Sequence, residues 1–198
     1  SLGSEAAAQR IETLELEHGP RRSWVWAALG ETPLAVASGH LAQLARRTRH
    51  LLPAGSVSEI LAAYTGGAWR ADDAVLRALS ATISKADRDA VVGAVRAVYT
   101  DWLDIGARRF QEAVGAAASG YVVRELSDWP TGTCLAFIDG LRFDVGRRVE
   151  GALLAEGYHT DVESRLTALP TITPTAKPAA SPVAGRLFPG SRLAPALK

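Results

Sequence analysis

A change in hydrophobic periodicity near residue 130 constrains the fold of this chain more than any other feature. From residue 1 to about residue 128, apolar side chains recur at helical spacing, and no stretch shows strand-like alternation. The longest run starts at Ser84, where Val91, Val95, Val98 and Trp102 trace one face. The turn-forming sequence Asp-Trp-Pro-Thr-Gly at 128–132 ends this pattern. The first part of the chain is therefore predicted to be a helical region.

The remainder predicts a strand, a helix and a second strand. An apolar run at 133–138 ends at Asp139, apolar residues then follow at intervals of four until Gly157, and residues 158–166 alternate. This order predicts parallel strands in a βαβ unit. Two strands and a helix cannot cover both faces of a parallel sheet, so more of the sheet must come from sequence outside these residues. We therefore predict a helical region at 1–130 and the incomplete first part of an α/β domain at 131–198.

The composition restricts partners and compartment. The 198 residues carry 22 basic and 21 acidic side chains, a balance that does not favour wholesale binding to nucleic acid or anionic membranes. The single cysteine, Cys134, excludes an internal disulfide and is predicted to be a small buried apolar residue of the first strand. No stretch reaches the length of a membrane span, so a cytoplasmic location is expected. The chain has no methionine, even at position 1, which indicates a removed start or a longer reading frame.

Two segments could carry chemistry at the carboxyl ends of the predicted strands. Asp139 ends the first strand, where a carboxylate can bind a cation or cap the following helix. The loop at 169–182 offers Thr171, Thr173, Thr175 and Lys177 between prolines. A threonine hydroxyl bound to a divalent cation can attack phosphorus. On spacing alone, a rigid Thr/Pro turn is the simpler interpretation of this loop.

A family resemblance favours the chemical interpretation. The segment 135–144, Leu-Ala-Phe-Ile-Asp-Gly-Leu-Arg-Phe-Asp, resembles a motif of the PglZ family, alkaline-phosphatase-superfamily members found in bacterial BREX phage-defence systems. The stretch 169–182, Leu-Pro-Thr-Ile-Thr-Pro-Thr-Ala-Lys-Pro-Ala-Ala-Ser-Pro, resembles the second motif of that family and the Pro-Thr-x-Thr loop of nucleotide pyrophosphatases. The resemblance covers about residues 129–185, and preceding helices fit the layout of the family. It implies that 131–198 begin an alkaline-phosphatase-like domain.

The resemblance also implies an activity. Asp139 matches the first metal ligand, for a divalent cation that is zinc in many relatives, and Thr173 matches the metal-bound nucleophile, with Thr171 and Thr175 ranked below it. The implied function is that of a metal-dependent phosphatase or phosphodiesterase in phage defence, working with other phage-defence proteins on a phosphoester. Nucleic acid is left open as the substrate. The rival hypothesis is a non-catalytic scaffold of a phage-defence complex.

The sequence departs from the superfamily pattern in two places. No Asp or His follows Asp161, although the superfamily needs such ligands later in the chain, so these residues alone are expected to lack activity. Lys177 stands where the pyrophosphatases often carry histidine. Arg142 and Asp144 match the family motif and are first interpreted as an ion pair or packing pair.

Three further groups have structural interpretations. A solvent-facing side of an edge strand explains His159, Asp161 and Glu163 better than a metal site does. The helix dipole accounts for the basic residues Arg46, Arg47, Arg49 and His50. Packing between helices accounts for the tryptophans Trp24, Trp26, Trp69 and Trp102.

Overall fold

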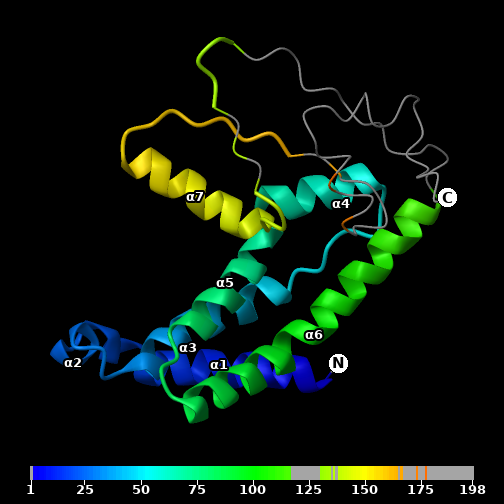
Figure 1. The fold of residues 1–198 in the computed structure, drawn as a ribbon. Coiled ribbons are helices and arrows are strands. Elements are labelled where there is room, and N and C mark those ends of the chain that lie inside the picture. Colours follow the sequence, from blue (N-terminus) through cyan, green and yellow to red (C-terminus); the bar gives the residue numbers. More distant parts are fainter. Residues whose placement is uncertain are drawn as a thin grey trace. The chain divides into compact units, whose positions relative to one another are not determined.

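Helices make up the regular structure of the part of the chain that the structure describes (Figure 1). The computed structural model describes residues 2–116, 130–134, 136, 138–164, 166, 173 and 177. The chain divides into two compact units, Ser1–Gly115 and Ala116–Lys198. The elements of the first unit are α1 (Leu2–His18), the 3-10 helix η1 (Gly19–Ser23), α2 (Val25–Ala28), α3 (Pro33–Thr48), α4 (Val57–Ala63), the π-helix η2 (Tyr64–Ala68), α5 (Trp69–Ser80) and α6 (Lys85–Ala116). The helical region predicted before residue 130 is confirmed within these residues.

Local capping sets where several helices begin. Ser56 precedes α4 and forms a capping box, in which its hydroxyl accepts from the Glu59 amide at 3.3 Å and its own amide donates to Glu59 Oε2 at 2.7 Å. Ser84 caps α6 in the same position, because its Oγ accepts from the Asp87 amide at 3.0 Å. A cap of this kind contributes about 1 kcal/mol. The predicted start of the long helix at Ser84 is confirmed.

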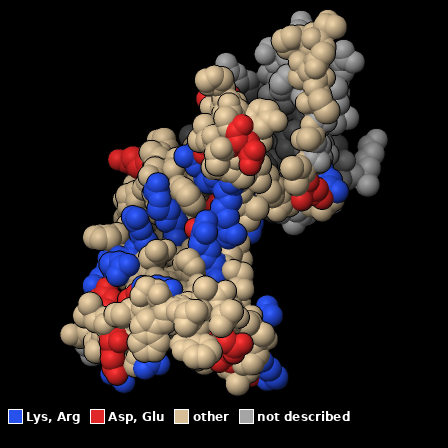
Figure 2. Space-filling view, turned by 90° about the vertical axis from the view of Figure 1, so that its left-hand side faces the viewer, with Lys and Arg blue, Asp and Glu red and all other residues tan. Residues whose placement is uncertain are grey.

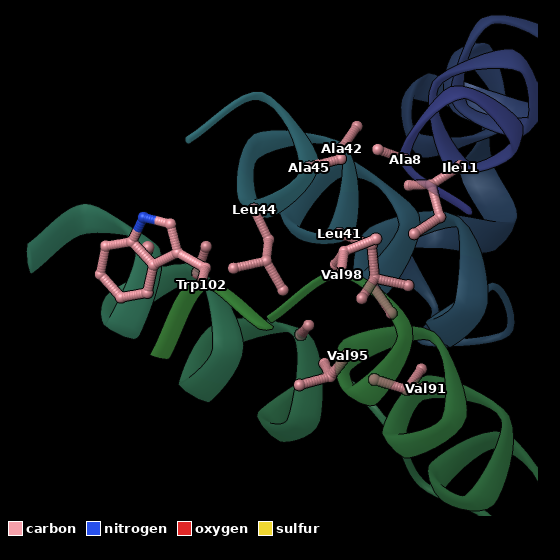
Figure 3. Close-up of a cluster of buried hydrophobic side chains, with 14 residues drawn as sticks. Ala8, Ile11, Leu41, Ala42, Leu44, Ala45, Val91, Val95, Val98 and Trp102 are labelled. Atoms are coloured by element: carbon pink, nitrogen blue, oxygen red, sulfur yellow. The ribbon is translucent and has the colours of Figure 1, made fainter. Parts of the chain in front are cut away.

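Small side chains let α3 pack closely between α1 and α5 (Figures 1 and 3). Alanine dominates the buried surfaces of all three helices, which brings their axes near to each other. Larger side chains fill the remaining space, and Leu44 of α3 is fully buried. The buried alanines of these helices are Ala8, Ala35, Ala37, Ala42, Ala45, Ala71, Ala74 and Ala78.

Helix α6 contributes one side of the same core and is fixed to it by polar contacts. Val91, Val95, Val98 and Trp102 point from α6 into the cluster, as the sequence periodicity predicts (Figure 3). The indole Nε1 of Trp102 also donates to the backbone oxygen of His50 at 3.0 Å. Burial and this hydrogen bond together hold α6 against the segment that follows α3.

A buried carboxylate joins three helical elements. Asp72 of α5 is 7% exposed, and its two oxygens accept hydrogen bonds from the hydroxyls of Tyr64 in η2 and Tyr99 in α6. A buried ionised group is costly unless it is hydrogen-bonded, so these hydroxyls make the position tolerable. The network ties α5, η2 and α6 together.

The packing interpretation of the tryptophans is right for Trp102 and wrong for the residues around α2. Trp102 is 5% exposed, whereas Trp24 and Trp26 are 51% and 55% exposed. Arg21 lies over the Trp24 ring at 5.8 Å, and Arg70 lies over Trp69 at 4.7 Å. Helix α2 has only four residues and no buried side chain, so it offers no second layer to cover these rings.

The second unit contains α7 (Phe143–Ala155). Gly157 follows it with φ of 84°, a left-handed conformation that suits glycine, so the predicted helix stop is confirmed. Residues 133, 134, 136, 138, 158–164 and 166 are described and belong to no strand, so the predicted βαβ unit is not seen in them. Residues 117–129, beside the predicted boundary near 130, lie outside the described residues.

The prediction that Cys134 is buried is wrong. Cys134 is exposed, and Ile138 in the same apolar run is 59% exposed. Within the described residues this run has no neighbouring strand to pair with, and a lone strand cannot bury its side chains. No helix in the described part of the chain is both long and apolar enough to cross a membrane.

Candidate functional site

Asp139 lies at the turn that leads into α7. It is followed by Gly140, whose φ of 69° lies in the left-handed region and reverses the chain before the helix. The Asp139 side chain is 57% exposed. The carboxylate is therefore presented to solvent just ahead of a helix, as the sequence interpretation requires for a ligand or an N-cap. Helix α7 has Arg142 at its N-cap position with no side-chain cap, so Asp139 does not cap it.

An ion pair connects the two sequence segments that resemble phosphatase motifs. Lys177 Nζ lies 2.8 Å from Asp139 Oδ2, and the lysine side chain is 44% exposed. Nothing in the local sequence of either segment predicts this pair. The contact nevertheless brings the Thr/Pro-rich segment to the carboxylate that ends the apolar run.

Thr173, the candidate nucleophile, is described together with Lys177, the partner of Asp139. Both residues have helical backbone conformation and both are exposed. Thr171 and Thr175, the lower-ranked candidates, lie outside the described residues.

Arg142 and Asp144 form the ion pair that the sequence analysis expects. Arg142 Nε donates to Asp144 Oδ1 at 3.0 Å and its Nη2 to Oδ2 at 3.3 Å, so the guanidinium binds both oxygens. Asp144 is fully buried in the first turn of α7, where the helix dipole also stabilises a carboxylate. The pair fixes the start of α7 and, through it, the turn that carries Asp139.

A cation site is not complete in the described residues. No group of three or more His, Cys, Asp or Glu side chains is positioned to hold a metal ion within them. A divalent zinc ion takes at least four ligands, and Asp139 supplies one carboxylate that Lys177 already neutralises. Asp139 thus fits a metal site only as one member of a larger ligand set.

The polar residues at 159–163 do not form such a set. His159, Asp161 and Glu163 are all exposed, as the solvent-facing interpretation predicts. Tyr158 and Val162 on the alternate positions are also 62% and 42% exposed. The alternation in this segment therefore does not separate a buried face from a solvent face in the described chain.

The first unit contains polar arrangements that the sequence interpretation missed. Arg22 pairs with Glu15, and Ser38 Oγ donates to Glu15 Oε2 at 2.7 Å, which links η1, α1 and α3. The hydrogen bond from Arg22 lowers the pKa of Glu15. The Asp72 network described above is the second case. In both, the partners come from different helices, so only a polar residue on an otherwise apolar helix face could have indicated them.

No family model, no curated protein and no solved structure matches the chain.

Proposed function

We propose that residues 131–198 carry the first part of a phosphohydrolase site, in which Asp139 binds a divalent cation and Thr173 is the nucleophile. The observation that supports this proposal is the 2.8 Å contact between Lys177 Nζ and Asp139 Oδ2. It joins two segments that each resemble a phosphatase motif and that are distant in the sequence. In an α/β sheet, such a meeting would occur where adjacent parallel strands end. The βαβ unit, completed by further strands, is part of this proposal.

The residues have defined roles in the proposed reaction. The Thr173 oxygen attacks phosphorus in line with the ester bond, the hydroxyl proton passes to solvent, and the alcohol of the ester leaves with its bonding electrons. Water then attacks the same phosphorus and releases phosphate from Thr173. A divalent cation held by Asp139 and further ligands, with zinc as the first candidate, would favour ionisation of the hydroxyl and offset the phosphoryl charge.

Lys177 has a role in the proposed site both before and after a cation binds. In the present structure its ammonium neutralises Asp139. Once a cation takes over that carboxylate, like-charge repulsion would release the ammonium, which could then bind a phosphoryl oxygen as a point charge. The fixed start of α7, held by the Arg142–Asp144 pair, keeps the Asp139 turn in place while Lys177 moves.

The protein is proposed to act in the cytoplasm, on a phosphoester, with other phage-defence proteins as partners. Nucleic acid is one candidate for this phosphoester substrate. The resemblance stated above supports this context. A non-catalytic scaffold built on the same fold is the alternative, and the exposed rings of Trp24 and Trp26 give it a surface for protein contacts.

The test uses the full-length protein that contains these residues. Hydrolysis of p-nitrophenyl phosphate and bis(p-nitrophenyl) phosphate is measured for wild type, Thr173→Ala and Asp139→Asn, with Thr175→Ala as the matched control. We expect Thr173→Ala to lower kcat at least about a thousandfold, as loss of a nucleophile does elsewhere, and Thr175→Ala to retain activity. Unchanged turnover in Thr173→Ala would reject the nucleophile. A wild-type protein that supports phage defence without hydrolysing either ester would favour the scaffold.

A further inference from the structure

A pocket in the helical unit lies beside the segment that follows α3, and its lining residues all belong to the first unit. Its volume is about 240 Å³. Its polar side is formed by Arg47 and His50, and its apolar side by the following residues: Leu51, Leu52, Ala63 and Ala68. Among the described residues, no acidic side chain lines it. The pocket therefore combines positive charge with a small apolar wall.

Arg47 is available to a ligand. Within the described residues it makes no ion pair or side-chain hydrogen bond, and its side chain is exposed. Its neighbour Arg49 differs, since it pairs with Glu5 at 3.2 Å and Glu12 at 3.0 Å. The helix dipole explains why basic residues gather at the end of α3. It does not explain why Arg47 lines the pocket without an acidic partner in the described part of the chain. Figure 2 shows basic side chains gathered on one face of the molecule.

Three backbone oxygens in the segment beside the pocket already accept hydrogen bonds, which lowers their repulsion toward an anion. The His50 oxygen accepts from Trp102 Nε1 at 3.0 Å, and the Leu52 oxygen accepts from the Arg109 guanidinium. The Arg47 oxygen accepts from the His50 amide at 3.1 Å. Arg109 adds a positive charge beside Leu52, so two cations without an acidic partner among the described residues, Arg47 and Arg109, lie at the segment 47–52. Such a surface attracts a multiply charged anion.

We propose that this pocket binds a small organic phosphate. A guanidinium can bind two phosphate oxygens at once, which suits Arg47, and the charge of Arg109 beside Leu52 adds to the attraction for a dianion. The apolar wall formed by Leu51, Leu52, Ala63 and Ala68 accommodates a compact carbon body. Because drug-sized ligands occupy roughly 300–1,000 Å³, a pocket of about 240 Å³ fits a smaller molecule. The site does not depend on the proposed hydrolase activity, because its residues all precede residue 130.

The experiment titrates the full chain with phenylphosphonate, whose carbon–phosphorus bond a phosphoester hydrolase does not cleave, and follows binding by calorimetry. Arg47→Gln tests the charge, and Ala63→Leu tests the pocket by filling it without changing charge. Arg96→Gln is the matched control, because Arg96 is exposed on α6 and does not line the pocket. Asp139→Asn reports on any binding at the proposed catalytic site. Circular dichroism confirms that each variant retains its helices.

We expect saturable binding to wild type, weakened at least about tenfold by Arg47→Gln, as loss of a charge-assisted contact would cause. Ala63→Leu should weaken binding as strongly, whereas Arg96→Gln should bind like wild type and Asp139→Asn should keep the binding that Arg47→Gln weakens. The proposal is overturned if wild type shows no saturable binding at millimolar phenylphosphonate, or if Arg96→Gln loses as much as Arg47→Gln. It is also overturned if Asp139→Asn alone abolishes binding, or if only a single-stranded oligonucleotide binds.

Discussion

The Asp72 network gives the sharpest prediction for the helical unit. Tyr99→Phe removes the hydroxyl that donates to Asp72 Oδ1 and keeps the ring that stacks on Trp102 at a centroid distance of 5.6 Å. Asp72 is 7% exposed, so water cannot readily replace the lost donor. A hydrogen bond to a charged group contributes about 1.5–3 kcal/mol. A loss of about 1 kcal/mol of stability lowers the Tm of a domain the size of the helical unit, Ser1–Gly115, by roughly 3–6 °C. We therefore expect the Tm to fall by roughly 5–18 °C.

The assay is urea and thermal unfolding of the full chain, followed by circular dichroism. The urea midpoint should fall while the m-value stays constant, which would show that stability and not compactness has changed. Tyr158→Phe is the matched control, because the Tyr158 ring is 62% exposed and its hydroxyl has no hydrogen bond within the described residues. A Tyr99→Phe variant as stable as Tyr158→Phe would refute the reasoning.

Two further predictions address packing and pH. Trp102→Ala should lower the free energy of unfolding in urea by about 3–5 kcal/mol, because it empties a buried site. Trp26→Ala should lower it by less than about 1 kcal/mol. Equal losses would contradict the packing described for α6. Burial lowers the pKa of His40, so the unfolded state binds the proton first as the pH falls. Stability should therefore decline as the pH drops through the ordinary histidine value of about 6.5, and His40→Gln should make that decline shallower in unfolding curves measured from pH 8 to pH 5; an unchanged slope would contradict it.

The sequence was sufficient to predict features that depend on neighbouring residues. Ser84 marks the start of α6 and Gly157 the end of α7 through features within a few residues, and the structure confirms both. The apolar stripe of α6 is predicted for the same reason, because periodicity alone defines the face. Such signals need no knowledge of the rest of the fold.

Features that depend on distant partners could not be predicted in the same way. Periodicity shows that Trp24 and Trp26 are apolar, but it does not show whether another helix covers them, and none does within the described chain. The Asp72 carboxylate finds its hydroxyl donors on other elements, and Lys177 reaches Asp139 across a long stretch of sequence. Each of these contacts follows from the tertiary arrangement, for which no local pattern exists.

The candidate site could be predicted only in part, for the same reason. The sequence singles out Asp139 and Thr173 through their resemblance to phosphatase motifs, whereas the ion pair with Lys177 comes from the structure. The strands predicted on either side of α7 stay a prediction, because a parallel sheet gains its stability from neighbouring strands and covering helices. Cys134, predicted to be buried by that sheet, is exposed here for that reason.

The most direct test of the proposed function is the position of zinc in a crystal structure of the full-length protein, located by anomalous diffraction. The account predicts one zinc ion about 2.0–2.2 Å from an Asp139 carboxylate oxygen, with the Thr173 hydroxyl in the same coordination shell and Lys177 displaced from Asp139. Zinc bound elsewhere, with the Asp139–Lys177 pair intact and Thr173 directed away from it, would contradict the account.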